Sequence, residues 1–214
     1  MTNVLSIKKI KEFHTWANSK MVTLIHHDDI ERIVTYKHSS SALLDAVYAI
    51  MQDKLAETTD SHKHHVKRWV YAHNYLLLVN RNSSSELLLK VFTFLYGDDP
   101  LTRGLVKGYD HDIYSKSVNP LLQHPNVTRK IVLKVYKVLK ESGRLGKTEI
   151  IELLSSKVLT TPDKIKIAEY FVTHPPKYNF LKTNWPSNIV EGLVANRNPA
   201  DLIQYTFENY DISV

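Results

Sequence analysis

The chain has 214 residues, of which 43% are hydrophobic, 10% aromatic and 23% charged, and its formal net charge is +6. This length and composition suit one compact domain or one short helical array, and they exclude disordered, collagenous and membrane-embedded classes. The chain contains no cysteine, which excludes disulfides, zinc–thiolate sites and thiol catalysis. No apolar run approaches the roughly 20 residues that span a bilayer, and no signal peptide is recognised, so we expect a cytoplasmic protein.

One pattern recurs along the chain. An apolar pair leads into a short polar break, and apolar residues at helical spacing with an aromatic residue follow. The first two copies, residues 34–48 and 78–92, align without a gap at an offset of 44 and share three serines. A third copy, residues 122–136, lies a further 44 residues on. A fourth begins at Leu159 after a shorter spacing of about 36, and a fifth begins at Leu193.

Each polar break has the composition of a helix start. Ser83 and Glu86 have the spacing of a capping box. Thr161-Pro162-Asp163 and Asn198-Pro199-Ala200-Asp201 each combine a cap, a proline at the first helical position and an acid in the first turn. The segments before the breaks are predicted to be helical as well: residues 28–37, 66–79, 113–122, 148–156 and 187–194. Each unit is therefore predicted to be a helix, a tight turn and a capped second helix.

Units of this size and make-up are typical of helical solenoids. The pattern over roughly residues 22–211 resembles the broad HEAT-like class of helical repeats, including variants whose second helix opens with a Pro/Asn cap after an apolar pair. This resemblance implies an all-α, right-handed α-solenoid of about five helical hairpins, forming a single domain over residues 1–214. Residues 1–21 would then form an N-terminal capping helix. The alternative is an irregular all-α bundle whose helix starts merely look alike.

The segment from residue 97 to residue 120 breaks this rhythm. It holds three of the six glycines, and all eight prolines of the chain lie at or after Pro100. We expect a long inter-repeat loop here, and long loops on rigid scaffolds often carry function. A short helix softened by glycine is the alternative.

The basic excess is concentrated in one window. Between Arg129 and Lys147 there are seven bases and one acid, which gives +6, equal to the net charge of the whole chain. Lys130, Lys134 and Lys137 follow i, i+4, i+7 spacing and therefore share one face of a helix. The second helices of HEAT-like solenoids usually line the concave face, so the resemblance implies that these lysines face a groove.

A row of lysines and arginines suits a phosphate backbone, which binds cations with release of counterions. We therefore expect a non-catalytic binding module whose partner is nucleic acid. An acidic protein surface is the first alternative, bound as an adaptor through the same face or through residues 97–120; a solvated face without a partner is the second. The predicted anion-binding residues are Arg81, Lys90, Arg129, Lys130, Lys134, Lys137, Arg144 and Lys147.

One enzymatic alternative rests on fold analogy. Some HEAT-like solenoids are DNA glycosylases, which hold a damaged nucleotide with aromatic side chains and a carboxylate. That family's catalytic residues do not map onto this chain, whose candidates would be Asp110, Asp112, Trp69 and Trp185. Fold alone does not carry function, so we expect no catalytic activity.

Two further motifs are weak. The tract His62-Lys63-His64-His65 lacks the spacing of a metal site, and lysines beside it would oppose a cation. We expect no metal and no cofactor. Gly143-Arg144-Leu145-Gly146-Lys147-Thr148 resembles the end of a P-loop, but Glu141 stands where that motif needs its first glycine. We interpret it as the glycine C-cap of one helix followed by the start of the next.

Overall fold

The computed structural model describes residues 7–22, 27–57, 63–96, 118–142, 147–174, 185–195 and 198–210. These residues form helices and turns with no strand among them, which confirms the predicted all-α class. The chain divides into two compact units, residues 1–107 and 108–214. The boundary lies in the predicted loop of residues 97–120, of which 97–117 lie outside the described residues.

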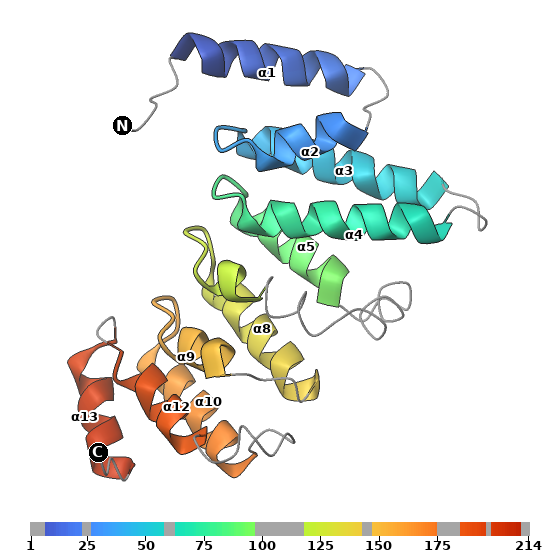
Figure 1. Cartoon of the computed structure of the whole chain (residues 1–214). Helices are drawn as coiled ribbons and strands as arrows, with labels where there is room; N and C mark the ends of the chain where they lie inside the picture. The colour runs from blue at the N-terminus through green and yellow to red at the C-terminus, as the bar shows by residue number, and fades with distance from the viewer. Residues whose placement is uncertain are drawn as a thin grey trace. The chain divides into compact units, whose positions relative to one another are not determined.

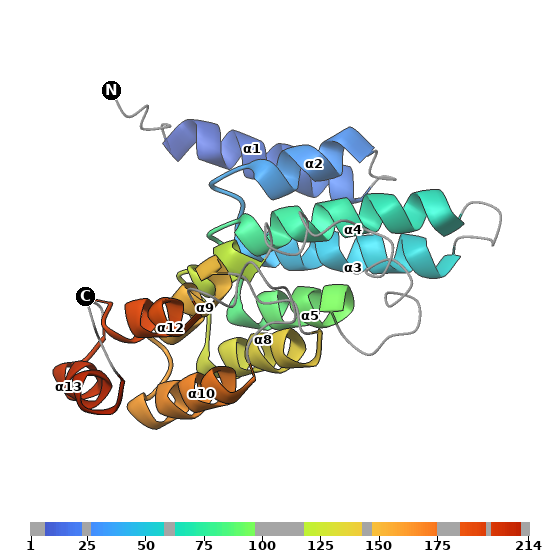
Figure 2. The same cartoon turned by 60° about the horizontal axis from the view of Figure 1, so that its bottom comes forward.

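The described residues of the first unit form five helices (Figure 1). Its central helix, α4, packs against α2, α3 and α5, and Figure 2 shows α3 and α4 running side by side. The helix α1 packs on α2 and α3 with Phe13 and Ala17 buried. The bounds are α1 Ile7–Val22, α2 His27–Thr35, α3 Ser41–Glu57, α4 Lys63–Val79 and α5 Ser85–Tyr96.

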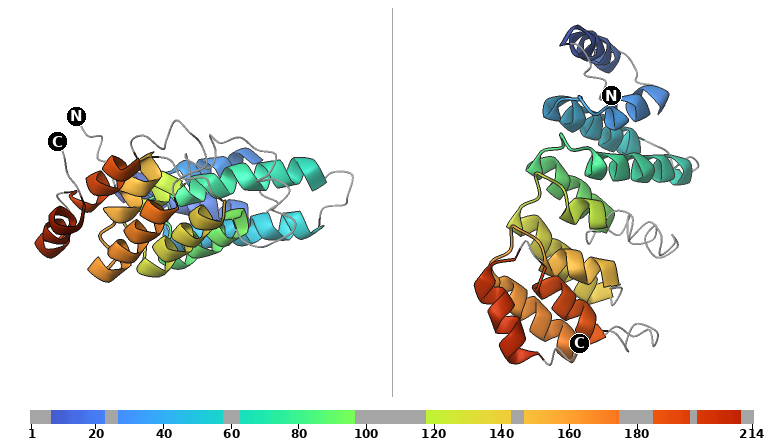
Figure 3. Two further views of the ribbon diagram at one scale, coloured as in Figure 1. Left: turned by 90° about the horizontal axis from the view of Figure 1, so that it is seen from below. Right: turned by 60° about the vertical axis from the view of Figure 1, so that its left-hand side comes forward.

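In the second unit, α9 packs closely on α12, and α12 also contacts α10 and α13 (Figure 3). A short helical segment, residues 118–122, precedes these helices. Their apolar sides are fully buried: Val135 on α8 and Ile167 on α10 are each at most 1% exposed. The bounds are α8 Arg129–Ser142, α9 Lys147–Leu154, α10 Thr161–Thr173, α12 Trp185–Leu193 and α13 Ala200–Asn209.

Pairs of helices are joined by turns of one geometry. The backbone N–H groups of Ser39, Ser83 and Val127 each donate to the carbonyl three residues earlier, at 3.1, 2.9 and 3.0 Å. Asn198 makes the same bond to the carbonyl of Ala195, at 2.7 Å. The helices after the first three turns begin at residues 41, 85 and 129, so these turns follow one another at the predicted offset of 44.

The serines of the first two turns have two different tasks. Ser39 and Ser83 are fully buried, and their hydroxyls donate to the carbonyls of Ile33 and Leu77, each at 2.6 Å. Ser84 caps α5 by accepting the N–H of Leu87 at 3.0 Å. The predicted capping box of Ser83 with Glu86 is therefore wrong. The side chain of Ser83 points inward to the preceding helix, and the next serine takes the cap.

Asparagine side chains connect the first turn to the second. Asn80 is 7% exposed, and its Nδ2 donates to the carbonyls of Val34 at 2.7 Å and Tyr36 at 3.3 Å. Its Oδ1 accepts the N–H of Asn82 at 3.0 Å, and Asn82 Nδ2 donates to the carbonyl of Lys37 at 2.7 Å. Each amide thus satisfies carbonyl groups of the turn 44 residues earlier, which holds consecutive turns in register.

The last turn uses a buried asparagine in a related way. Asn198 Nδ2 donates to the carbonyls of Gly192 and Leu193, each at 2.9 Å, and to that of Leu154 at 3.3 Å. Its Oδ1 accepts a hydrogen bond from the ammonium of Lys164, a side chain only 2% exposed. The prediction that Asn198 caps α13 is wrong. Pro199 is the cap residue and no side chain caps the helix, because the amide of Asn198 is turned into the interior.

The fourth turn corrects the predicted spacing. The helix α10 begins at Thr161, 32 residues after α8 begins at Arg129, instead of about 36. Thr160 is the N-cap and forms a capping box with Asp163, with Pro162 in the first helical turn. Thr160 therefore replaces Thr161 as the cap. Leu159, which the sequence pattern aligns with Leu122, lies instead where the other turns have Ser39 and Ser83.

Close helix packing in the second unit requires a glycine. A Cβ added at Gly192 would lie 2.9 Å from Leu154 Cβ and 3.2 Å from Ile151 Cα. Real Cβ atoms do not approach other carbons this closely, so α12 reaches α9 only because residue 192 lacks a side chain. The carbonyl of this glycine is also a hydrogen-bond acceptor of Asn198.

The link between the first two turns predicts a difference between two asparagines. Asn80→Ala leaves buried carbonyl groups of the first turn without their donor, so we expect a loss of about 2 kcal/mol in the free energy of unfolding. Asn82→Ala removes one exposed bond, and we expect a loss of less than ~1 kcal/mol. Urea denaturation followed by circular dichroism measures both variants. Equal losses would contradict the role given to Asn80.

The close contact between α9 and α12 predicts that Gly192→Ala lowers the stability of the protein, although alanine favours helix formation. Gly192→Ala gains up to ~1 kcal/mol of helix propensity, but overpacking costs about 1–3 kcal/mol, so we expect a lower urea midpoint. Ser187→Ala, at an exposed position of the same helix, is the matched control and should leave the midpoint unchanged or raise it. A Gly192→Ala variant more stable than the parent protein would show that the helices separate without cost.

Candidate nucleic-acid interface

The predicted basic residues of the second unit lie on and around α8, and α8 is held against α10 by an arginine. Arg129 Nε donates to Asp163 Oδ2 and Arg129 Nη2 to Asp163 Oδ1, each at 2.7 Å. Such a bidentate pair fixes geometry more strongly than a single ion pair. The side chain of Asp163 is only 13% exposed. Arg129, predicted to bind an anionic partner, thus already has an anionic partner within the chain.

Asp163 also closes the capping box of α10. Its Oδ2 accepts the N–H of Thr160 at 3.0 Å and the Thr160 hydroxyl at 2.7 Å. The hydrogen bond from Arg129 holds the pKa of this carboxyl well below its ordinary value; burial opposes the shift, and the Thr160 bonds support it. One carboxylate therefore both starts α10 and attaches it to the start of α8.

Aromatic contacts continue along the same two helices. The ring of Tyr136 meets Tyr170 and Phe171 edge-on, with centroids 6.0 and 5.7 Å apart. Lys140 Nζ lies 4.1 Å from the centroid of the Tyr170 ring. Because the starts of α8 and α10 meet through Arg129 and their later turns meet through Tyr136, the two helices run parallel.

Three of the other predicted bases have carboxylate neighbours. Lys147 pairs with Glu191 at 2.9 Å, and Lys137 has a looser contact with Glu141 at 3.8 Å. In the first unit Lys90 pairs with Glu86 at 2.9 Å, and this pair raises the pKa of Lys90. Arg81 is exposed in the turn after α4. Arg144 lies outside the described residues.

Four lysines form the lysine row, defined here as Lys130, Lys134 and Lys137 on α8 and Lys166 on α10. Lys130, Lys137 and Lys166 are exposed, and Lys134 is half-buried. With α10 starting 32 residues after α8, Lys166 occupies the position in its helix that Lys134 occupies in α8. The sequence interpretation missed Lys166 because it aligned the fourth copy about four residues too late. Neither Lys130 nor Lys166 forms an ion pair or hydrogen bond with another described residue.

The candidate residues of the enzymatic alternative are only partly visible. Asp110 and Asp112 lie outside the described residues, and so does the side chain of Trp185 at the start of α12. Trp69 is half-buried on α4, where its ring lies 5.6 Å from Lys54 Nζ and 4.9 Å from the ring of His73.

The histidine tract gives no metal site among the residues that can be described. Among the described side chains there is no group of three or more His, Asp or Glu that could hold a metal ion. His62 and the side chains of His64 and His65 lie outside this set.

The P-loop-like segment joins two helices. The helix α8 ends at Ser142 and α9 begins at Lys147, and the residues between them are not described.

Within the described part of the chain, every helix is too short or too polar to cross a membrane.

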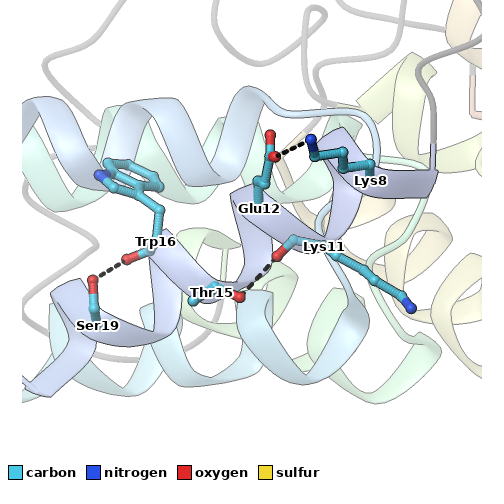
Figure 4. A pocket seen from close by; sticks show the side chains of 6 residues that line it. All are labelled: Lys8, Lys11, Glu12, Thr15, Trp16 and Ser19. Atoms are coloured by element: carbon cyan, nitrogen blue, oxygen red, sulfur yellow. Dashed lines mark hydrogen bonds and ion pairs between the residues drawn. The ribbon is translucent and has the colours of Figure 1, made fainter.

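An open depression lies along α1, away from its buried side (Figure 4). Its volume is ≈ 770 Å³, and the described residues that line it are Lys8, Lys11, Glu12, Thr15, Trp16 and Ser19. Figure 4 shows Lys8 near Glu12, at 4.0 Å, and the Ser19 hydroxyl bonded to the carbonyl of Trp16 at 2.7 Å. The guanidinium carbon of Arg32 lies 4.3 Å from the centroid of the Trp16 ring. The sequence pattern gives no indication of this depression.

Comparison with known proteins gives no relative. No protein-family model, no curated protein and no solved structure matches the chain.

The ionised Asp163 predicts a defined pH dependence. Its pKa is lower in the folded protein than in the unfolded chain, so its contribution to stability is complete above pH ~4 and is lost as the pH falls through the folded-state pKa. We expect Asp163→Asn to cost about 2 kcal/mol at pH 7. The gap between variant and parent should shrink as the pH falls below ~4.

Urea denaturation at a series of pH values between 2 and 7 measures this gap. Asp53→Asn is the matched control, because Asp53 is exposed on α3 and lies away from the start of that helix. A gap for Asp163→Asn that stays constant over this pH range would show that the carboxylate charge does not matter.

Proposed function

We propose that this protein is a non-catalytic helical-repeat module that binds the phosphate backbone of nucleic acid on the lysine row. The fold part of this proposal is an α-solenoid of helical hairpins. It is supported by the recurrence of one turn geometry and by the asparagine bonds that join a turn to the turn before it. Parallel second helices, such as α8 and α10, are what stacked hairpins produce.

The observation that carries the proposal is a row of lysines on two adjacent helices, in which Lys134 and Lys166 occupy matching positions. Lys130 and Lys166 are exposed and have no described carboxylate partner. Adjacent packed helices lie about 8–10 Å apart, so equivalent positions on α8 and α10 present their charges to the same side. The two helices together contain six lysines and three acids, Glu141, Asp163 and Glu169.

Ammonium groups in this arrangement suit phosphate. Each lysine is a compact charge on a flexible stem that neutralises a phosphate without demanding a fixed geometry. Neutralisation releases the counterions condensed on the polyanion, which gives an affinity that falls steeply with salt. Arg129, Lys147 and Lys90 have carboxylate partners within 3 Å, so we assign them to the scaffold and leave binding to the lysine row.

The proposal predicts salt-dependent binding of a mixed-sequence oligonucleotide, measured by fluorescence anisotropy between 50 and 300 mM salt. Lys130→Glu/Lys134→Glu/Lys166→Glu should weaken binding and reduce the slope of log K against log salt by about 3, because each phosphate contact contributes ~0.9. The neutral pair Lys130→Gln/Lys166→Gln should reduce the slope by about 2. Circular dichroism verifies that both variants fold.

The control variant is Lys9→Glu/Lys37→Glu/Lys157→Glu, which changes the net charge equally at three scattered exposed positions. It should retain most of the salt slope. Absence of binding at 50 mM salt, or equal losses in both triple variants, would overturn the proposal. Binding of poly-glutamate but not of the oligonucleotide would favour an acidic protein partner instead.

A further inference from the structure

Two large hydrophobic side chains are exposed among the described residues, Val172 and Phe207, at 45% and 62%. Phe207 lies on α13, where Leu202 and Thr206 form the buried side. Burying an aromatic ring is a major source of association energy. The exposed ring therefore marks one face of α13 as a candidate interaction surface.

Phe207 has the same position in α13 as a helix-contacting residue, Tyr136, has in α8. Phe207 lies seven residues after the first residue of α13, as Tyr136 lies seven residues after the first residue of α8. The ring of Tyr136 contacts Tyr170 and Phe171 on the next second helix, α10. Phe207 is thus the counterpart on α13 of Tyr136, the residue through which α8 contacts the helix α10 that packs on it. No described residue makes a ring contact with Phe207.

The charge around Phe207 is negative. The exposed side chains of α13 include Asp201 and Glu208, and this helix contains no lysine or arginine. A helix that packs on this face is therefore expected to be basic and to offer apolar surface to the phenylalanine ring.

The first helix of the same chain has this chemistry. On α1, Lys8, Lys9 and Lys11 are exposed and Glu12 is the one acid. The depression on its outer side is lined by Lys8 and Lys11 together with the half-exposed Trp16. Its other side is occupied, because Phe13 and Ala17 pack on α2 and α3.

We propose that α13 of one molecule docks on α1 of a second copy of this chain, in a head-to-tail arrangement. Phe207 enters the depression beside Trp16, and Asp201 and Glu208 approach Lys8 and Lys11. The two surfaces are different, so the contact is heterologous and its extent should depend on the protein concentration.

The first experiment is sedimentation velocity on the full chain over a wide concentration range, at 50 mM and 500 mM salt. We expect mass to rise with concentration at low salt and to rise less at high salt, because exposed charges are screened. Phe207→Ser should leave a monomer under all conditions. Val172→Ser removes a similar exposed apolar side chain from α10 and should leave the association unchanged.

A charge exchange tests the partner surfaces. Lys8→Glu/Lys11→Glu makes both helices acidic, and Asp201→Lys/Glu208→Lys makes both basic, so each variant alone should be monomeric. Mixing the two should restore association, since every α1 then meets an α13 of opposite charge. A parent protein that stays monomeric would overturn the proposal. The proposal would also be overturned if the Lys8→Glu/Lys11→Glu variant still associated by itself. That result is expected if α13 packs on α13 of another copy.

Discussion

The turn inside each helix pair decides which residues of the following helix face inward. Its backbone bond, from Ser39, Ser83, Val127 or Asn198 to the carbonyl three residues earlier, fixes the chain direction. Side-chain bonds to the helix before the turn then fix the start of the helix after it. Because these donors and acceptors are buried, losing one of them leaves a polar group without water or partner, which is far more costly than losing an exposed bond. The position of the core, and therefore of the exposed face, follows from these turns.

Charged side chains that bond to other residues of the chain differ from those that are exposed to a partner. Asp163 is both a member of the capping box that starts α10 and the partner of Arg129, so an arginine of the basic window holds two helices together. Lys164 is buried against Asn198 at a helix position where α3 and α5 have leucine. The charge that is left for a partner is smaller than the sequence total suggests. It lies on the lysine row, where Lys130 and Lys166 have no described carboxylate partner.

The helical class, the first three helix starts and the face shared by Lys130, Lys134 and Lys137 could be predicted from the sequence, because periodicity and a gap-free offset are local signals. The cap residues could not. In Ser83-Ser84 and Thr160-Thr161 either residue can cap a helix, and only the packing of the preceding helix shows which one turns inward. The fourth copy was misaligned because Val158 and Leu159 resemble the apolar pair of the earlier copies. With that alignment Lys166 did not correspond to Lys134, and it was not predicted. The pairs Arg129–Asp163 and Lys164–Asn198 join residues 34 positions apart, beyond any local pattern. Arg144, Asp110 and Asp112 lie outside the described residues and stay predictions.

The central claim is that α8 and α10 run in parallel with Lys134 and Lys166 at equivalent positions. The chain contains no cysteine, so paired cysteines can be introduced without background. A rigid bis-maleimide that spans about 10 Å, the separation of packed helices, should cross-link Lys134→Cys/Lys166→Cys quickly. It should cross-link Lys134→Cys/Thr173→Cys slowly, because residue 173 lies about 10 Å further along the helix. Faster cross-linking of the second pair would contradict the register on which the lysine row depends.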